Sequence, residues 1–118
     1  MKSKIKGDYG ENVALGYLEA KGYKILFTNY KVGGGEIDII AQDGEYTVFV
    51  EVKHRQGNTF GDGLDAINPT KVRRIIKTAK TYLYKQGQNQ NLCRFDIMEI
   101  FGIEQLEINH IENAFWED

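Results

Sequence analysis

The sequence contains a single cysteine, Cys93, which excludes an internal disulfide and is typical of a protein from a reducing compartment. No stretch of it approaches the roughly 20 apolar residues that a membrane-spanning helix requires. The basic opening MKSKIKGDYGEN has no apolar segment behind it, so it does not resemble a signal peptide. We therefore expect a cytoplasmic protein with no membrane partner.

Acidic residues are missing between Lys71 and Lys85. This stretch carries a charge of +6 while the whole 118-residue chain carries −2, so the remainder carries −8. One basic element on an acidic body is typical of a protein that binds a polyanion such as DNA. The alternative is a helix face that is simply solvated. The residues that we expect to contact nucleic acid are Lys71, Arg73, Arg74, Lys77 and Lys80.

The first half of the chain predicts a helix followed by three strands. Apolar residues recur at helical spacing from Ala14 to Leu18, and Gly22 ends the helix. Residues 23–30, YKILFTNY, are rich in the aromatic and β-branched side chains that favour a strand. Residues 33–55, GGGEIDIIAQDGEYTVFVEVKHR, predict two further strands joined by a tight turn.

The second half predicts one more helix and two strands. A long polar loop with three glycines, residues 55–67, comes first. Asn68 and Pro69 then begin the helix as its cap and first residue, and Gly87 ends it. The segments CRFDIMEIF and LEINHI predict the last two strands. The order αβββαββ indicates an α/β or α+β fold, and 42% hydrophobic content suits a single domain over residues 1–118.

Charged residues accompany both strands of the hairpin, although the strands are apolar enough to enter a core. Side chains alternate along a strand, so Glu51 and Lys53 share one face. Asp38 joins them on that face only if the connecting loop has an even number of residues. A two-residue turn at residues 43–44 would place Asp38 diagonally opposite Glu51, and a four-residue loop over residues 43–46 would place it directly opposite. Either loop brings the two carboxylates together.

Two carboxylates and a lysine on one face of buried strands are costly to desolvate, and a divalent cation offsets that cost. Oxygen ligands from Asp38 and Glu51, with retained waters, suit Mg²⁺ or Mn²⁺. With Lys53 to orient a water or offset charge on a phosphate, such a site hydrolyses phosphodiesters. Glu-x-Lys alone is weak evidence, because Glu19-Ala-Lys21 has the same pattern. An ordinary cross-strand network of ion pairs is therefore the alternative.

Five segments of the chain resemble, in their order, the PD-(D/E)XK nuclease superfamily, and in particular the small bacterial YraN-type proteins, which are similar to archaeal Holliday-junction resolvases. The segments are Gly10-Glu11, GGGEIDII, VFVEVKHR, residues 71–74 and CRFDIM. The resemblance implies a restriction-endonuclease-like α/β fold, with a central mixed five-stranded sheet flanked by helices. It assigns Asp38 and Glu51 as metal ligands and Lys53 as the catalytic lysine. One departure is Ile37, which stands where the superfamily motif has proline.

The resemblance also adds Glu11 as an acid that the first helix contributes to the active site. Asp8 lies three residues before it, so Glu11 could instead complete a capping box. Because Glu11 shares its helix face with apolar residues, we expect it to point inward. Glu36 shares a face with Asp38 and is an accessory candidate, either as a further ligand or as the partner of Arg55. The expected catalytic residues are Glu11, Asp38, Glu51 and Lys53.

Other charged residues carry no functional prediction. His54 and His110 are far apart in the sequence without a metal-ligand pattern, and we expect them at the surface or at a sheet edge. Asp96 and Glu99 lie on opposite faces of one strand, so they do not form a pair.

The leading hypothesis is a Mg²⁺- or Mn²⁺-dependent endonuclease that hydrolyses DNA. Contacts to the phosphate backbone do not read sequence, which fits selection of branched or junction DNA by shape. The symmetry of a junction would favour a homodimer. One alternative is a nucleic-acid-binding module that keeps the fold but no longer cleaves. Another is a structural or protein-interaction domain whose charges merely pair.

Overall fold

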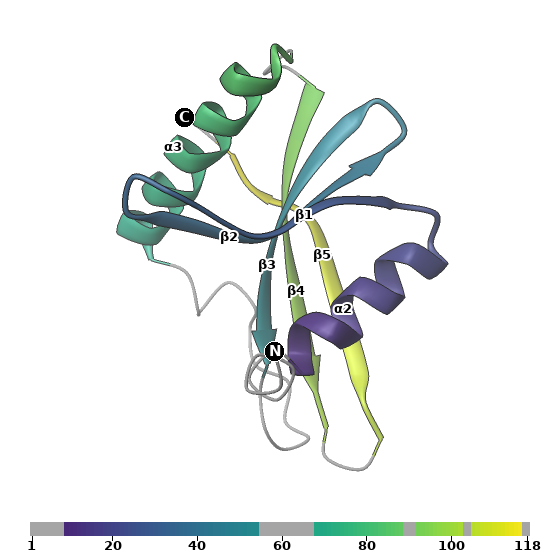
Figure 1. Cartoon of the computed structure of the whole chain (residues 1–118). Helices are drawn as coiled ribbons and strands as arrows, with labels where there is room; N and C mark the ends of the chain where they lie inside the picture. The colour runs from purple at the N-terminus through teal and green to yellow at the C-terminus, as the bar shows by residue number, and fades with distance from the viewer. Residues whose placement is uncertain (1–8, 55–67, 89–91, 103–104, 117–118) are drawn as a thin grey trace.

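The computed structural model describes residues 9–54, 68–88, 92–102 and 105–116. Within these residues, helices and strands follow one another in the predicted order αβββαββ (Figure 1). The helices are α2 (Tyr9–Ala20) and α3 (Pro69–Gln86), and the strands are β1 (Lys24–Val32), β2 (Gly35–Asp43), β3 (Tyr46–His54), β4 (Cys93–Phe101) and β5 (Glu107–Phe115). Arg55 and the polar loop that follows it lie outside the described residues.

The strands form one mixed sheet in the order β1-β2-β3-β4-β5. β3 and β4 run parallel, and every other neighbouring pair is antiparallel. A parallel pair needs a crossover connection, and α3 lies in the connection between β3 and β4. The sheet confirms the predicted α/β, restriction-endonuclease-like arrangement with a mixed five-stranded sheet.

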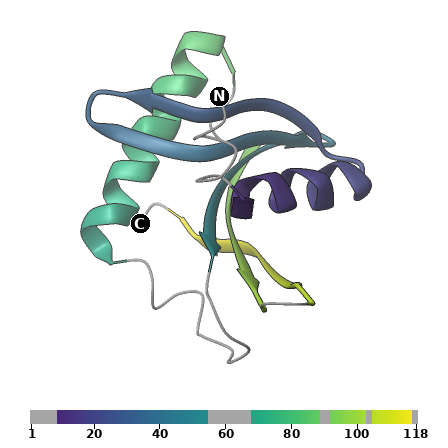
Figure 2. The same ribbon diagram turned by 60° about the horizontal axis from the view of Figure 1, so that its bottom comes forward.

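The two helices cover opposite faces of the sheet (Figure 2). The core cluster on the α2 side comprises Ala14, Leu18, Tyr23, Ile39, Ala41, Val48, Val50, Met98 and Ile100. The cluster on the α3 side comprises Ile37, Ile40, Phe49, Ile75, Ile76, Ala79, Tyr82, Leu83 and Phe95. Full burial of one such large side chain stabilises the fold by about 1.5–3 kcal/mol, so both helices are fixed to the sheet.

The ends of α3 follow the signals in the sequence. The Asn68 side chain accepts a hydrogen bond from the Lys71 N–H at 2.8 Å, with Pro69 at the start of the helix. Gly87 ends it with a φ of 66°, in the left-handed region that glycine adopts at low cost. Of the described helices, neither combines the length and the apolar character needed to cross a membrane.

The β2–β3 turn sets the register between the two strands. Asp43 pairs with Tyr46, so the turn is Gly44-Glu45 and not residues 43–44 as the two-residue alternative had it. The resulting register, with Ile39 opposite Val50, is that of the four-residue alternative, and one more pair in the same register would set Asp38 opposite Glu51. The loop therefore has an even number of residues, as the convergence of the two carboxylates requires. It lies one residue later than the two-residue turn at residues 43–44.

β2 leaves β3 at Asp38. Of the described pairs between these strands, the last joins Ile39 to Val50, whereas β2 stays paired with β1 as far as Gly35. Ile37 packs on the α3 side while Ile39 packs on the α2 side, so the regular alternation of side chains is broken between them. The free end of the β1–β2 hairpin extends toward α3 (Figure 1). We call the divergence of β2 from β3 at Asp38 the fork.

Gly35 lets the free end of the hairpin pack closely on α3, because an added Cβ would overlap the Thr78 hydroxyl oxygen. Gly35→Ala is therefore expected to lower the free energy of unfolding by about 1–3 kcal/mol, the usual cost of overpacking. Thr78→Ala removes the obstructing oxygen, so we expect the double variant to recover most of the loss. Denaturant unfolding of the single and double variants measures both effects. Simple additivity of the two single losses would contradict this packing.

A buried network of ion pairs lies on the α2 side of the sheet. Asp96 is fully buried and accepts two hydrogen bonds of 3.0 Å from the Arg94 guanidinium. Its carboxylate also lies 2.7 Å from Nε2 of His110 and accepts the Asn113 N–H at 2.9 Å. His110 does lie on β5, an edge strand, but its side chain is only 3% exposed, so a surface position for it is wrong. The physical reason is its contact with the buried carboxyl group of Asp96, which holds the ring against the sheet.

Candidate functional site

Asp38 at the fork lies in an environment that is unfavourable for a negative charge. Burial raises the pKa of Asp38 from its ordinary 3.8 to about 7, and the negative charge of Glu51 is the next cause. The Val52 N–H donates to Asp38 Oδ2 at 2.8 Å and opposes that rise. The charges of Glu11 and Glu36 raise the pKa of Asp38 further. Acidic side chains from α2, β2 and β3 thus converge on the fork.

Glu51 is the second carboxylate of the fork and is only 8% exposed. Its Oε2 lies 2.6 Å from Nζ of Lys71, which comes from the first turn of α3. The sequence predicts Lys71 only as a nucleic-acid contact. Its ion pair with Glu51 has no local signal, because the two residues are 20 positions apart. The ammonium group neutralises one of the two carboxylates that face each other here.

Glu11 reaches the fork from α2 and is half-buried, as its helix face predicted. Its Oε1 accepts a hydrogen bond of 3.1 Å from the Asn29 side chain. Asn29 has a φ of 53°, a left-handed conformation that asparagine tolerates better than most residues. Sequence reasoning missed Asn29, since one asparagine within a strand pattern is a weak signal. Asp8, the rival partner in a capping box, lies outside the described residues.

Lys53 lies two residues beyond Glu51 on the same strand face. It is paired in register with Glu99 of β4, which is fully buried. The Asn109 side chain donates to Glu99 at 3.4 Å. The face that carries Glu51 therefore continues through Lys53 to the buried side chain of Glu99.

The accessory candidate Glu36 is exposed and lies opposite Lys31 of β1. Its proposed partner Arg55 is outside the described residues, so that pairing stays a prediction. The basic residues of α3 are spread around the helix. Arg74 and Lys77 line a hollow beside the hairpin, whereas Arg73 is exposed and donates to Thr70 at 3.3 Å. The fifth predicted contact, Lys80, is half-buried.

The donor set at the fork fits a divalent cation that keeps most of its waters. In the part of the chain that the structure describes, no three His, Cys, Asp or Glu side chains form a complete cage for a metal ion. Asp38 and Glu51 nonetheless offer the hard carboxylate oxygens that Mg²⁺ uses one or two at a time. The raised pKa of Asp38 and the ammonium beside Glu51 both indicate a place that attracts positive charge.

Residues 10–100 match the model of the Uncharacterised protein family UPF0102. The chain belongs to this family. A UPF0102 protein of Clostridioides difficile (strain 630) is 45% identical over 115 residues, which cover 98% of this chain and 100% of the relative. A UPF0102 protein of Geobacter metallireducens is 45% identical over 116 residues, covering 98% of this chain and 95% of the relative. A UPF0102 protein of Symbiobacterium thermophilum is 42% identical over 115 residues, covering 96% and 98%.

UPF0102 membership confirms the YraN-type resemblance seen in the sequence. The part of the chain that matches the UPF0102 model contains the whole fork and the helix beside it. The names of these UPF0102 relatives state no activity. The function of this UPF0102 chain is therefore argued from the chemistry of the fork.

The raised pKa of Asp38 predicts that the chain becomes less stable as the pH rises from about 4 to about 7. In that window the folded chain keeps a proton that the unfolded chain has released, so each rise in pH favours unfolding. Without divalent cations, we expect a higher Tm at about pH 5 than at about pH 8. Thermal denaturation of the wild type beside Asp38→Asn measures this, because the variant lacks the titrating group. A wild-type Tm that rises with pH more steeply than that of the variant would contradict it.

Proposed function

We propose that this UPF0102 chain is a nuclease that hydrolyses DNA phosphodiester bonds with Mg²⁺ or Mn²⁺. The observation that carries the proposal is the pKa of about 7 for Asp38, caused by burial and by the facing charge of Glu51. A structural ion pair would lower the pKa of its carboxyl, whereas a carboxylate pair held together against its own repulsion is typical of a functional site.

The roles of the residues follow from their places around the fork. Asp38 and Glu51 would hold the cation through their carboxylate oxygens. When bound, the cation polarises the phosphate and lowers the pKa of a water molecule. Lys53, next on the face of Glu51, would stabilise the negative charge that develops on the phosphate oxygens. Lys71 would exchange its contact with Glu51 for one with the substrate phosphate.

Glu11 completes the acidic surroundings of the fork from the side of α2. Its hydrogen bond with Asn29 fixes one carboxylate oxygen and so sets the orientation of the side chain. Of the residues assigned here, Glu11 would add negative charge beside Asp38, and Lys53 would bind a phosphate oxygen.

Branched or junction DNA is the substrate class that we favour within this proposal. The basic residues of α3 offer contacts to phosphates, which read the shape and not the sequence of DNA. A homodimer would match the symmetry of a four-way junction. The likeness of YraN-type proteins to junction resolvases supports this choice.

Binding of nucleic acid without cleavage is the second candidate function. The pair of Lys71 with Glu51 favours it, because the ammonium already neutralises one of the two carboxylates. In that case Lys71 would keep Glu51 as its partner, and only Asp38 would remain as a carboxylate ligand for a cation.

Cleavage of labelled junction and linear DNA tests the proposal directly. We expect nicking in Mg²⁺ or Mn²⁺, faster on the junction, and none in EDTA. Binding of either DNA without nicking in any divalent cation would favour the second candidate instead. If the chain neither binds nor nicks either DNA, both candidate functions are wrong and its role is unrelated to nucleic acid.

Mn²⁺ is expected to raise the Tm of the wild type more at about pH 8 than at about pH 5, because protonated Asp38 is a poor ligand. A ligand of the folded state at a hundredfold excess over its Kd stabilises it by about 2.7 kcal/mol. Asp38→Asn is expected to lose most of this gain. An equal gain in wild type and variant would place the cation elsewhere.

A further inference from the structure

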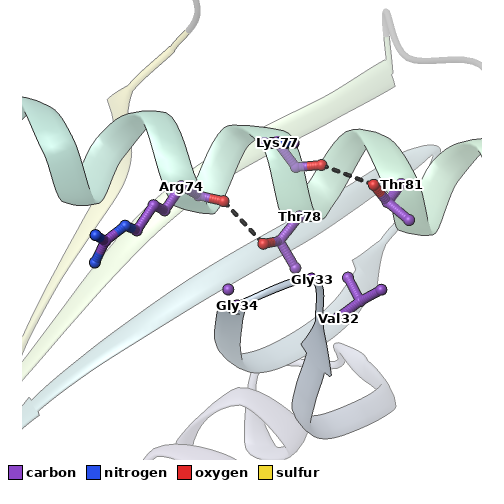
Figure 3. Close-up of a pocket in the computed structure, with 8 residues that line it drawn as sticks. Val32, Gly33, Gly34, Arg74, Lys77, Thr78 and Thr81 are labelled. Atoms are coloured by element: carbon purple, nitrogen blue, oxygen red, sulfur yellow. Dashed lines mark hydrogen bonds between the residues drawn. The ribbon is translucent and has the colours of Figure 1, made fainter.

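A groove runs along α3 from the fork to the tip of the β1–β2 hairpin. Two adjoining cavities form it, of about 410 Å³ near the fork and about 460 Å³ near the tip. Both are lined by Gly34, Gly35 and Arg74. The cavity near the fork is also lined by Glu36, Asn68, Thr70, Lys71 and Ile75. The cavity near the tip, shown in Figure 3, is also lined by Val32, Gly33, Lys77, Thr78 and Thr81.

The cavity near the tip has a cationic wall. Arg74 and Lys77 contribute to it, and among its described lining residues there is no carboxylate. The Thr78 hydroxyl donates to the Arg74 carbonyl at 2.8 Å, and the Thr81 hydroxyl donates to the Lys77 carbonyl at 3.1 Å. Since the hydroxyl protons are used within α3, the side-chain donors for a ligand are the guanidinium and ammonium groups.

The opposite wall is bare backbone. Gly33 and Gly34 form the hairpin turn between the paired residues Val32 and Gly35, with φ values of 54° and 84°. This turn requires positive φ at both positions, which glycine adopts without strain. Arg74 and Gly34 line the same cavity, and Figure 3 shows the Arg74 side chain leaving α3 above Gly34 with its guanidinium directed along the helix, away from the turn. A large anion can therefore approach the backbone closely from this side while Arg74 contacts it from α3.

The groove is linked to the fork through Lys71. Lys71 lines its near end and contacts Glu51, and Lys77 lines its far end. Six helical residues span about 9 Å at 1.5 Å per residue. Successive phosphates of one DNA strand are farther apart than the axial rise of about 3.4 Å per nucleotide, so this length spans fewer than three nucleotides.

We propose that the groove is a subsite for the backbone of one nucleic-acid strand, with a phosphate held between Arg74 and the Gly33-Gly34 turn. The subsite rests on the proposed function, because the fork would hold the scissile phosphate of the same strand. Arg74 lines both cavities, but Glu36 lines only the one near the fork, so the adjacent phosphate is favoured in the cavity near the tip, which Lys77 also lines. The strand is either free or part of a duplex.

The basic residues of α3 are thereby unequal. Both arginines are exposed, but Arg74 lines both cavities of the groove, whereas Arg73 is not among their described lining residues and donates to Thr70. The proposal therefore leaves Arg73 outside the subsite, although the sequence predicted it as a nucleic-acid contact. The two arginines share residue type, helix and net charge, so Arg73→Ala is a matched control for Arg74→Ala. Lys85 is exposed in the last turn of α3 and serves in the same way for Lys77.

Fluorescence anisotropy in EDTA tests the subsite without cleavage. Labelled single-stranded, duplex and junction DNA are titrated with wild type, Arg73→Ala, Arg74→Ala and Arg74→Lys at several salt concentrations. Arg74→Ala is expected to weaken binding by about tenfold and to lower the salt slope by about one, whereas Arg73→Ala changes Kd by less than about twofold. Arg74→Lys should recover most of the binding, which also shows that the loss is not one of folding.

The outcomes separate the subsite from the nuclease proposal. Equal losses in Arg73→Ala and Arg74→Ala, or no DNA binding by the wild type, would overturn the subsite. A selective loss in Arg74→Ala with no cleavage by the wild type would support the subsite and refute the nuclease. A selective loss on single strands alone places a free strand in the groove, and the same loss on duplex DNA places a duplex strand there.

Discussion

Asp38→Asn is expected to lower the rate of DNA cleavage by about two to three orders of magnitude, the scale of losing one electrostatic group that acts on the transition state. Asparagine keeps the size of Asp38 and an oxygen that can accept the Val52 N–H, so the fork should keep its shape. It loses the charge that would hold the cation. Single-turnover cleavage of junction DNA in Mg²⁺ measures the loss.

The same variant is expected to be more stable than the wild type at about pH 8. A carboxyl whose pKa is about 7 in the folded chain, against its ordinary 3.8, costs about 4 kcal/mol when it is ionised. Asparagine places a polar amide beside Glu51, so we expect it to recover about half of this, roughly 2 kcal/mol in the free energy of unfolding. A residue that merely paired charges would show the opposite sign.

Glu45→Gln, in the β2–β3 turn, is the control for Asp38→Asn. Glu45 lies exposed in the turn between β2 and β3, and Glu45→Gln removes one negative charge there. We expect Glu45→Gln to keep both cleavage and stability close to those of the wild type. Glu51→Gln should lose cleavage as Asp38→Asn does. Equal cleavage by all of these variants would assign the activity to a contaminant.

Asp96→Ala is expected to lower the free energy of unfolding by about 3–5 kcal/mol, because it leaves a buried guanidinium without its main partner. Burial by itself would raise the pKa of Asp96, but the hydrogen bonds from His110 and Arg94 outweigh it and lower that pKa. The stability that Asp96 contributes is therefore present above its ordinary pKa of 3.8 and is lost as the pH falls through its lowered pKa. Urea unfolding at about pH 7 measures the loss.

Asp43→Asn is the matched control for Asp96. Asp43 accepts a hydrogen bond of 3.1 Å from the same Arg94, but its side chain is 44% exposed. Exposed pairs contribute about 0–1 kcal/mol, so Asp43→Asn should be nearly neutral. Similar losses in both variants would show that burial does not set the strength of this network. Cleavage per folded molecule should stay unchanged in both, because the network lies on the α2 side, away from the groove.

The helices and strands could be predicted because their signals are local. Asn68 and Gly87 cap α3 through neighbouring backbone groups, and Gly22 takes the left-handed conformation, with a φ of 96°, just after α2. The position of the β2–β3 turn was displaced by one residue, yet the convergence of Asp38 and Glu51 survived. It depended only on the parity of the loop, which either even loop provides.

The contacts that could not be predicted join residues far apart in the chain. Lys71 meets Glu51 because the crossover helix begins beside the fork, and no spacing in the sequence encodes that position. His110 lies on an edge strand, one of its two predicted positions, but its burial could not be predicted because its partner Asp96 lies on another strand. Asn29 reaches Glu11 through a backbone conformation that its sequence neighbours do not signal.

The close seat of Gly35 on Thr78 joins the β1–β2 hairpin mechanically to α3. Asp38 lies on that hairpin, while Glu51 lies on β3, so the spacing of the two carboxylates depends on where α3 holds the hairpin. A polyanion that bridges the hairpin and α3 would restrict changes in this spacing and so raise the affinity of the two carboxylates for a cation. By thermodynamic reciprocity the bound cation would then raise the affinity of the chain for the polyanion by the same factor.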